Sequence, residues 1–307
     1  MKKIFLYNNN FFLKDKAETF LKKILGRNSR GPNAVFESLA LGLRGLGEEF
    51  CVNCKPESQA EVACVLSGVR TLAWAIEQKK KRVFKKLVAG PNIVVNPNEE
   101  GGLLKNSLID IIIAPSQWVK DYYSAVAPEI AGKIQIWPAG VVVPPLPRAK
   151  EKQTDFLVYN KIGDNILLEY GLEYLKNKGF SYKVFTYGRF KQQDYYAWLE
   201  KTKYEIYLSN SESQGLAMFE AWARGVPTLV WEKGFYKSEG VRISGKISAP
   251  FLEKASGLFF SNENDFASRF DEFLNIKYEP REYVKANFTN KITAQNYLYI
   301  CYGKKGN

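Results

Sequence analysis

The 307-residue chain contains no histidine. That absence excludes imidazole as a general base, as a member of a hydrolytic triad and as a metal ligand. An Asp-x-Asp pair, a common way to hold a divalent cation, is also missing from the sequence. Any reaction at this protein must therefore depend on carboxylates, amines, hydroxyls and backbone groups, and we expect no metal ion and no other cofactor.

Long apolar runs are missing too. No run approaches the roughly 20 residues that span a bilayer. The first residues, MKKIFLYNNN, have only the short apolar run Ile4–Tyr7 before three asparagines. This run is too short for a signal peptide and is typical of a first strand. We therefore expect a cytoplasmic protein, and a peripheral position at the inner face of the membrane stays open.

Cysteine is scarce, at four residues, and only Cys51 and Cys54 are close in the sequence, as CVNC. A structural zinc site normally uses four ligands, and no histidine is available to complete one. The stretch EEFCVNC is apolar enough to form a strand. We favour buried thiols over metal binding or redox chemistry for these cysteines.

Basic residues are plentiful. The net charge is +12, and the first 150 residues carry +9 of it. The densest run, EQKKKRVFKK at residues 77–86, is either the solvated end of a helix or a surface for an anionic partner such as a membrane or a phosphate-bearing substrate. The neighbouring apolar side chains either rest on an anionic bilayer, which would suit a lipid-linked acceptor, or belong to the core: Leu72, Trp74, Ala75 and Ile76.

Short β-rich runs alternate with helical patterns along the whole chain. ACVLSG, KKLVAGPN and IDIIIAPS predict strands, and TLAWAIEQKKKR and QWVKDYYSAVA predict helices. This alternation predicts the α/β class, with parallel sheets covered on both faces. The proline-rich stretch VVVPPLPRAKEKQ predicts a linker between an N-terminal domain over 1–145 and a C-terminal domain over 146–307. The last helix, at about 291–303, is a candidate to return to the first domain.

The stretch SESQGLAMFEAWARGVPT, residues 211–228, places Glu212 and Glu220 on either side of Gly215. The run before it, YEIYLSN, predicts a strand, so Glu212 falls in a loop at the carboxyl end of a parallel strand. Open α/β sheets bind their ligands at that edge. The residues after Gly215 predict a helix that ends at Gly225. Taken alone, two glutamates at this spacing are common on solvated helix faces.

The start of this predicted helix suits an anion. Free amides and the positive end of the helix dipole at Gly215 and Leu216 favour a diphosphate, with the loop residue Gln214 beside it. Glu220 lies about one and a half turns further along the helix and is placed to accept the hydroxyls of a ribose. Glu212 is placed to accept the hydroxyls of a sugar. Together these positions fit a nucleotide diphosphate sugar that lies across the helix start.

The stretch SNSESQGLAMFEAWARGVPTLVW resembles the E-x7-E region of retaining glycosyltransferases of the GT-B fold, especially glycosyltransferase family 4 and its relatives. Three other pieces resemble the same family in the same order: RGPNAVFESLALGLRGLGEEF, DIIIAPSQWVKDYY and IQIWPAGV. The resemblance implies two Rossmann-like α/β/α domains that face each other across a cleft. It also implies a donor held mainly by the C-terminal domain and an acceptor held mainly by the N-terminal domain.

The resemblance also implies roles for residues outside this stretch. The family usually has an arginine and a lysine on the donor diphosphate after the linker, whereas here Lys161 stands alone beside Asn160. The family often has a histidine beside the donor sugar, and its counterpart here is the end of KKLVAGPN, where Gly90, Pro91 and Asn92 stand instead. We therefore assign Lys161, Glu212 and Asn92 to catalysis.

Three more residues are assigned to donor binding. Gly31 either lets the backbone approach the phosphates or simply starts a helix. Tyr187 and Gly188 follow a predicted strand next to the site and are placed to frame the base, although Tyr187 is equally suited to the core.

The hypothesis from the sequence is a metal-independent, retaining glycosyltransferase of polysaccharide biosynthesis. It would move a sugar from a UDP-sugar or GDP-sugar to a glycan or lipid-linked acceptor, and Lys161 and the helix dipole would stabilise the departing diphosphate. One alternative is a sugar-nucleotide epimerase of the same fold, whose chemistry usually needs acid and base groups. Another is a basic binding module for membrane or nucleic acid, which explains the charge but not the two glutamates; we expect no nucleic-acid partner.

Overall fold

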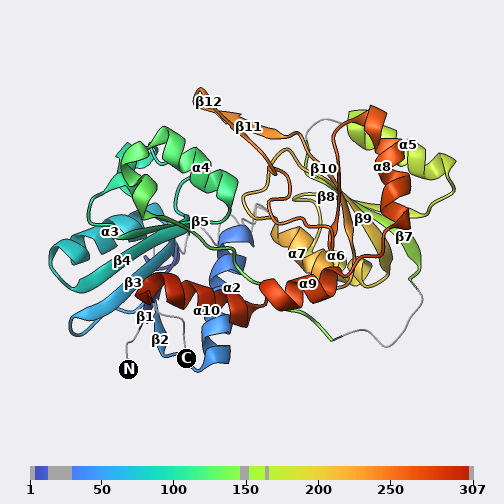
Figure 1. Ribbon diagram of the computed structural model, residues 1–307. Helices are drawn as coiled ribbons and strands as arrows, with labels where there is room; N and C mark the ends of the chain where they lie inside the picture. The colour runs from blue at the N-terminus through green and yellow to red at the C-terminus, as the bar shows by residue number, and fades with distance from the viewer. Residues whose placement is uncertain (1–3, 13–29, 146–151, 163–165, 304–307) are drawn as a thin grey trace. The chain divides into compact units, whose positions relative to one another are not determined.

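The computed structural model of the protein describes residues 4–12, 30–145, 152–162 and 166–303. The chain divides into two units, each built around its own parallel sheet (Figure 1). The first unit holds the residues up to Gly140, the short segment Glu239–Val241 and the segment that begins at Asn290. The second unit comprises Val141–Ser238 and Arg242–Thr289.

The first unit contains a six-stranded sheet with the strand order β2-β1-β3-β4-β5-β6. All of its strand pairs are parallel. Most residues of these strands are buried, because helices cover both faces of a parallel sheet. This burial explains the nearly continuous apolar runs in the sequence. Its strands are β1 (Ile4–Tyr7), β2 (Phe50–Val52), β3 (Ala60–Ser67), β4 (Phe84–Asn92), β5 (Ile111–Ala114) and β6 (Ile134–Ile136).

Helices of the first unit come from both ends of the chain. Those in the described part of the chain are α2 (Arg30–Leu46), α3 (Val69–Lys80), η1 (Glu100–Lys105), α4 (Gln117–Val126), η2 (Pro128–Lys133) and α10 (Asn290–Tyr302). Helix α10, the last one of the chain, is anchored to this unit by the Trp137 indole, whose Nε1 donates to the carbonyl of Thr293 at 2.7 Å. The predicted strands and helices of this unit are confirmed.

Helices α2 and α10 lie side by side (Figure 1), and Gly42 makes their close approach possible. A Cβ atom at position 42 would overlap the carbonyl oxygen of Asn290 and lie 2.5 Å from the Cβ of Ala294. On the same face of α2, the hydroxyl of Ser38 donates to Asn290 Oδ1 at 3.0 Å. Only glycine therefore fits at position 42.

The expectation of buried thiols is wrong for Cys51 and Cys54, which are half-buried and form a disulfide with each other. Strand β2 ends after three residues, and Asn53 turns the chain with a φ of 53°. This turn brings the two Cα atoms to 5.8 Å, within the usual range for a disulfide. The expectation holds for Cys64 and Cys301, which are buried free thiols.

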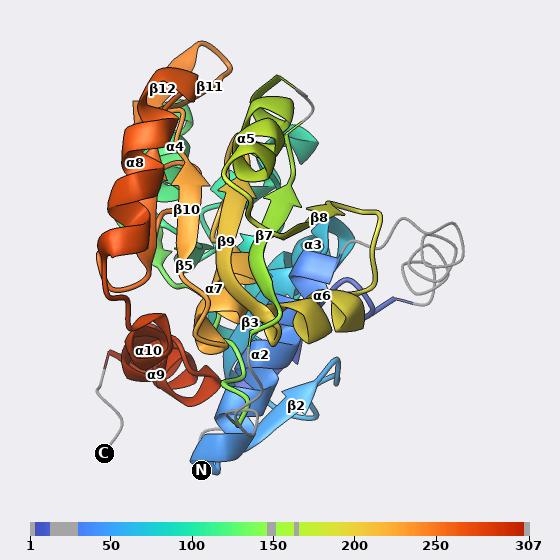
Figure 2. The same ribbon diagram turned by 90° about the vertical axis from the view of Figure 1, so that its right-hand side faces the viewer.

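The second unit contains a five-stranded sheet with the order β13-β10-β9-β7-β8 (Figure 2). All of its strand pairs are parallel. The strands are β7 (Thr154–Asn160), β8 (Tyr182–Thr186), β9 (Thr202–Leu208), β10 (Thr228–Trp231) and β13 (Gly257–Phe260). The edge strand β13 and the separate hairpin of β11 (Phe235–Ser238) and β12 (Val241–Ser244) are not evident from the sequence pattern.

Alternating side chains of β7 show how this sheet is covered. Phe156 and Val158 pack in one cluster with residues of α5 (Ile166–Asn177) and α8 (Glu263–Asn275). Leu157 and Tyr159, which point to the other face, pack in a second cluster. That cluster includes residues of α6 (Gln192–Leu199), α7 (Leu216–Ala223) and α9 (Pro280–Asn287). The unit is thus a three-layered α/β/α sandwich, as predicted.

Two glycines of α2 provide a matched test of the α2–α10 contact. Gly42→Ala should lower the free energy of unfolding by about 1–3 kcal/mol, because the added methyl overlaps α10. Gly45→Ala, in the same helix but exposed and without an atom within 4 Å of the new Cβ, should raise it by up to about 1 kcal/mol. Urea unfolding of both variants measures the two effects. Equal shifts in the same direction would contradict the close packing at Gly42.

Candidate functional site

Three adjacent strands bring the main predicted residues of the second unit to one edge of the sheet. Strands β8, β7 and β9 are neighbours and parallel, so their carboxyl ends lie together. Lys161 follows β7, and its backbone N–H donates to the carbonyl of Leu208 at the end of β9 at 2.8 Å. Tyr187 follows β8, and its N–H donates to the carbonyl of Asn160 at 2.8 Å. Glu212 lies in the loop after β9.

Lys161 and Glu212 form an ion pair at this edge. The Lys161 Nζ lies 2.9 Å from Glu212 Oε1, with 29% of the lysine side chain and 10% of the glutamate side chain exposed. The same Lys161 Nζ lies 4.9 Å from the centre of the Tyr187 ring. The lysine therefore stands at the surface of the site, and the carboxylate lies deeper.

Tyr207, a residue that the sequence argument missed, supports Glu212 from beneath. Its hydroxyl donates to Glu212 Oε1 at 2.8 Å. Its ring stacks on Tyr159 with centroids 4.6 Å apart and the planes 4° from parallel. Burial, and then the Glu212 charge, raises the pKa of Tyr207 well above its ordinary value. Tyr207 is therefore a permanent hydrogen-bond donor, and it fixes the orientation of the Glu212 carboxylate.

Helix α7 starts as predicted, with its amino end at this same edge. Gly215 is the N-cap residue and has a φ of 86°, a left-handed conformation that favours glycine. The first helical N–H groups, at Leu216 and Ala217, belong to those that have no acceptor inside a helix. Gln214, just before the glycine, is buried. Glu212 and Gly215 are neighbours, because a Cβ at position 215 would lie 3.8 Å from Glu212 Cβ.

Glu220 is held by helix α6. The Tyr196 hydroxyl donates to Glu220 Oε1 at 2.5 Å, and Gln192 Nε2 donates to Glu220 Oε2 at 2.5 Å. The guanidinium of Arg224, one turn further along α7, lies 4.0 Å from the centre of the Tyr196 ring. Each carboxylate oxygen has a donor from α6, so the orientation of the group is fixed before any ligand binds. The sequence signal for these partners is their spacing of four residues, which places Gln192 and Tyr196 on one helix face.

Glu232, also missed from the sequence, organises the loop that supports Glu212. Its two carboxylate oxygens accept the N–H groups of Gly234 at 2.7 Å, Ile247 at 2.8 Å and Ser248 at 3.0 Å. The carbonyl of Ile247 in turn accepts the N–H of Glu212 at 2.9 Å. Burial raises the pKa of Glu232, and the three N–H groups oppose this effect. Glu232 thus positions Glu212 through the backbone of the intervening loop.

A fully buried acid lies under helix α7. Glu205 Oε1 accepts the Tyr195 hydroxyl at 2.8 Å, and the same hydroxyl lies 3.1 Å from the carbonyl of Ala217. Burial, and then the nearby Glu220 charge, raises the pKa of Glu205 to about 8. At neutral pH, Glu205 is therefore mostly a neutral carboxylic acid. It connects β9 through Tyr195 to the first turn of α7.

Not every predicted residue lies in this cluster. Asn92, at the end of β4, and Gly31, in the first turn of α2, belong to the first unit, and their roles at the donor stay predictions. The Asn160 side chain is buried and accepts the N–H of Ile162 at 3.2 Å, so it shapes the turn after β7. Tyr187 is 54% exposed and hence not a core residue, and Gly188 after it has a φ of 81°.

Metal ligands do not gather in the described part of the chain. Within residues 4–12, 30–145, 152–162 and 166–303, there is no cluster of three or more cysteine, aspartate or glutamate side chains that could hold a metal ion. The positive groups at the site are Lys161 and the amino end of α7. These are the groups of the site that can bind an anion directly.

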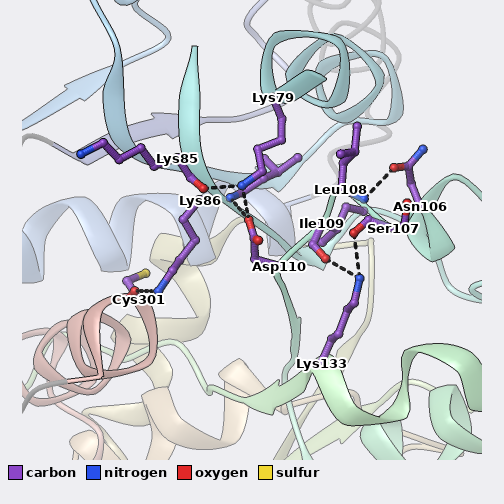
Figure 3. A network of polar contacts seen from close by, with 11 residues as sticks. Lys79, Lys85, Lys86, Asn106, Ser107, Leu108, Ile109, Asp110, Lys133 and Cys301 are labelled. Carbon is purple, nitrogen blue, oxygen red and sulfur yellow. Dashed lines mark hydrogen bonds and ion pairs between the residues drawn. The ribbon is translucent and has the colours of Figure 1, made fainter. Parts of the chain in front are cut away.

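The basic run lies at the opposite edge of the first sheet from Asn92. Some of its lysines form hydrogen bonds and ion pairs within the first unit (Figure 3). Lys79 Nζ lies 2.8 Å from Asp110 Oδ2 and also contacts the carbonyl of Lys85. Lys86 Nζ donates to the carbonyl of Cys301 at the end of α10, at 2.6 Å. The exposed basic residues that remain are Lys80, Lys81 and Arg82, together with Lys85, which pairs with Glu61.

The apolar residues next to this run serve the core. Leu72, Ala75 and Ile76 are buried. Trp74 is half-buried in a group of aromatic rings, with its centroid 4.5 Å from that of Phe11 and 5.1 Å from that of Tyr7. Of the two alternatives for these side chains, the structure supports the packed helix with a solvated end. Among the residues that the structure describes, no helix combines the length and the apolar character needed to cross a membrane.

No protein-family model matches the chain, and no curated protein matches it. Several solved structures, however, have a fold similar to that of this chain. One is the apo form of the lipopolysaccharide outer core galactosyltransferase WaaB, at 11% identity and a TM-score of 0.59. The alignment covers 99% of this chain and 99% of WaaB. Another is sucrose-phosphate synthase from Thermosynechococcus elongatus, at 11% identity and a TM-score of 0.55. That alignment covers 97% of this chain and 98% of the synthase.

A third match is S. aureus TarM in complex with fondaparinux, alpha-GlcNAc-glycerol and UDP, at 12% identity and a TM-score of 0.56. It covers 87% of this chain but only 59% of TarM, so the chain spans about three fifths of that protein. At such identities the likeness establishes the fold. The chain has the GT-B fold, with two Rossmann-like parallel sheets, which confirms the predicted fold class.

Glu205 should make the stability of the protein depend on pH. Its pKa of about 8 in the folded chain lies above the ordinary value of 4.5, so the folded chain binds more protons than the unfolded chain between these values. The free energy of unfolding should therefore fall as the pH rises through this window, by up to about 1.4 kcal/mol per unit. Glu205→Gln keeps an acceptor for the Tyr195 hydroxyl and cannot ionise, so this variant should gain stability over the wild type from pH 5 to pH 8.

Urea unfolding at pH 5, 7 and 9 measures this difference. The control is Glu169→Gln, at an exposed position of α5 in the same unit. The free energy of unfolding of this control should change with pH as that of the wild type does. A constant difference between Glu205→Gln and the wild type over the whole range would contradict a buried, neutral Glu205.

Proposed function

We propose that the protein is a retaining, metal-independent glycosyltransferase that uses a nucleotide diphosphate sugar. One observation carries this proposal: Lys161, Glu212 and the amino end of α7 meet at the carboxyl edge of β7 and β9, with Glu220 further along α7. A lysine and helix amides suit a diphosphate, and two oriented carboxylates suit the hydroxyls of the groups at its two ends. The GT-B fold supports the same assignment.

The donor would use the site in a defined order along α7. Its diphosphate would accept hydrogen bonds from the amides of Leu216 and Ala217 and would attract Lys161 away from Glu212. The ribose hydroxyls would donate to Glu220, which Tyr196 and Gln192 already orient. The sugar hydroxyls would donate to Glu212, which would keep its bond from Tyr207. Tyr187, exposed beside Lys161, would cover one face of the nucleotide.

The proposed reaction transfers the sugar with retention of configuration. The bond between the anomeric carbon and the diphosphate oxygen breaks, and a bond from that carbon to an acceptor hydroxyl oxygen forms on the same face. The proton of the acceptor hydroxyl passes to the departing phosphate oxygen. Lys161 and the α7 amides would stabilise the negative charge that develops there, which is the main task of the protein in such a step. A glycan or a lipid-linked sugar would supply the hydroxyl.

Donor consumption without an acceptor tests the proposal. The wild type should slowly release the nucleoside diphosphate from either UDP-sugars or GDP-sugars, with or without excess EDTA. Glu212→Gln should lower this rate at least tenfold without weakening the binding of the free nucleotide, because its role is at the sugar. Glu253→Gln, at an exposed position of the same unit, is the matched control. Loss of activity in EDTA with recovery in manganese or magnesium would overturn the metal-independent assignment.

Glu220 should determine the preference for ribose over 2′-deoxyribose. Glu220→Ala should weaken binding of the matching nucleotide by about 1.5–3 kcal/mol, since a hydrogen bond to a charged group is typically worth that much. The wild type should also bind UDP or GDP more tightly than the 2′-deoxy counterpart, and this difference should vanish in the variant. Tyr196→Phe should reduce the difference without removing it. Calorimetry with both nucleotides measures these affinities, and an unchanged difference in Glu220→Ala would remove Glu220 from the ribose.

A further inference from the structure

Strands β11 and β12 form a hairpin that is separate from the five-stranded sheet of the second unit (Figure 1, Figure 2). Its turn consists of Glu239 and Gly240, which have φ values of 51° and 74°. Two residues with positive φ form the tight turn that matches the twist of a two-stranded hairpin. At the other end, the N–H of Gly245 donates to the carbonyl of Gly234 at 3.1 Å. These two ends fix the register of the strands.

This register gives the hairpin two different faces, because side chains alternate along each strand. One face consists of half-buried side chains: Tyr236, Ser238, Val241 and Ile243. The opposite face, together with the lysine that lies two residues before β11, carries three exposed cations, and we call it the cationic face. Its members are Lys233, Phe235, Lys237, Arg242 and Ser244. The solvated side of the hairpin is therefore the charged one.

The cations of this face gather at one aromatic ring. The guanidinium carbon of Arg242 lies 3.9 Å from the centre of the Phe235 ring, and Lys233 Nζ lies 4.7 Å from it. In this register Lys237 lies opposite Arg242, where like charges repel each other and destabilise a strand pair. Among the residues that the structure describes, no carboxylate forms an ion pair with any of these three cations. An anionic ligand would remove this repulsion.

The hairpin begins beside the candidate donor site. It follows β10, whose neighbour β9 leads to the loop of Glu212. Glu232, just after β10, accepts the N–H of Gly234 at the base of the hairpin and the N–H of Ile247 beyond it. The carbonyl of Ile247 accepts the N–H of Glu212. The base of the hairpin is therefore attached to the loop that we assign to the donor sugar.

The composition of the cationic face limits the kind of anion. Within residues 233–246, all of which the structure describes, no large apolar side chain is exposed, so the hairpin offers none to insert into a bilayer. The Phe235 ring is half-buried and already has two cations against it, which leaves little of it for the bases of a single-stranded nucleic acid. A guanidinium and free lysines suit carboxylates or phosphates. A glycan with such groups on successive sugars can meet several of these cations at once.

We propose that the cationic face of the β11–β12 hairpin binds an acidic glycan, one that carries carboxylates or phosphates. Naming this glycan as the acceptor rests on the proposed glycosyltransferase function, whereas the binding itself does not. As acceptor, the glycan contacts the hairpin through sugars other than the one that receives the transferred sugar. The protein then selects an acidic polysaccharide over a neutral one, and it does so through the hairpin rather than through the basic run at residues 77–86.

Binding of the full-length protein to immobilised polysaccharides, measured by biolayer interferometry, tests the proposal. The probes are polygalacturonate, phosphomannan and neutral dextran. The wild type should bind at least one of the two acidic glycans and should not bind dextran. The double variant Lys237→Gln/Arg242→Gln should lose at least about tenfold in affinity, because it lacks two charged contacts. Its Tm should not fall, since the change removes a pair of like charges on opposite strands.

Two control variants each remove two exposed cations elsewhere. Lys176→Gln/Lys277→Gln changes the second unit, in α5 and just after α8, and Lys80→Gln/Lys81→Gln changes the basic run. Both should bind the acidic glycans as tightly as the wild type. An equal loss in either control would overturn the proposal. So would tighter wild-type binding to duplex DNA or to phosphatidylglycerol vesicles than to the acidic glycans, or no binding to either acidic glycan.

Calorimetry with UDP and GDP on the same preparations separates this proposal from the proposed function. The three variants should bind nucleotide as the wild type does, because none of the changed residues is assigned to the nucleotide. Nucleotide binding without any binding of acidic glycans would overturn the hairpin proposal alone. Binding of acidic glycans without any nucleotide binding would overturn the glycosyltransferase proposal and leave the hairpin surface standing.

Discussion

The pairing of β7 with β9 is the constraint on which the site in the second unit depends. Because the two strands are parallel and Asn160 lies opposite Leu208, the residues that follow them emerge at the same point. Lys161 comes from one strand and the Glu212 loop from the other, and their ion pair of 2.9 Å is a consequence of that register. A slip by one residue would turn Lys161 to the opposite face of the sheet.

The half-buried Glu232 and the fully buried Glu205 stabilise this arrangement, and each loses hydration in the fold. Glu232 offsets the cost with three backbone N–H groups, which fix the loop that holds Glu212. Glu205 accepts the Tyr195 hydroxyl on one oxygen, and its other oxygen has no hydrogen-bond partner among the residues that the structure describes. Burial therefore penalises its charged form and raises its pKa to about 8. Burial raises the pKa of both acids, but at Glu232 three N–H groups oppose the rise, whereas Glu205 is mostly neutral at pH 7.

Local signals in the sequence were sufficient for the fold class, for most strands and helices, and for the loop and helix that carry Glu212 and Glu220. The partners of these residues were not predictable, because Tyr207, Glu205 and Glu232 lie on or next to strands whose pairing is set by distant segments. The disulfide was missed for a similar reason: apolar neighbours suggested burial, whereas the left-handed turn at Asn53 decides the outcome. The edge strand β13 and helix α9 have short patterns that only packing stabilises.

The Lys161–Glu212 ion pair would make the protein bind a donor more tightly than the nucleoside diphosphate product. A nucleoside diphosphate that attracted Lys161 would take the ionic partner from Glu212, whose side chain is only 10% exposed. Weakening the bonds of a buried carboxylate costs on the order of 1–3 kcal/mol. An intact nucleotide sugar offsets this cost with the hydroxyls of its sugar, whereas the nucleoside diphosphate left after transfer has none to offer. The same ion pair that keeps Glu212 oriented in the unliganded chain would therefore favour donor over product and promote release after transfer.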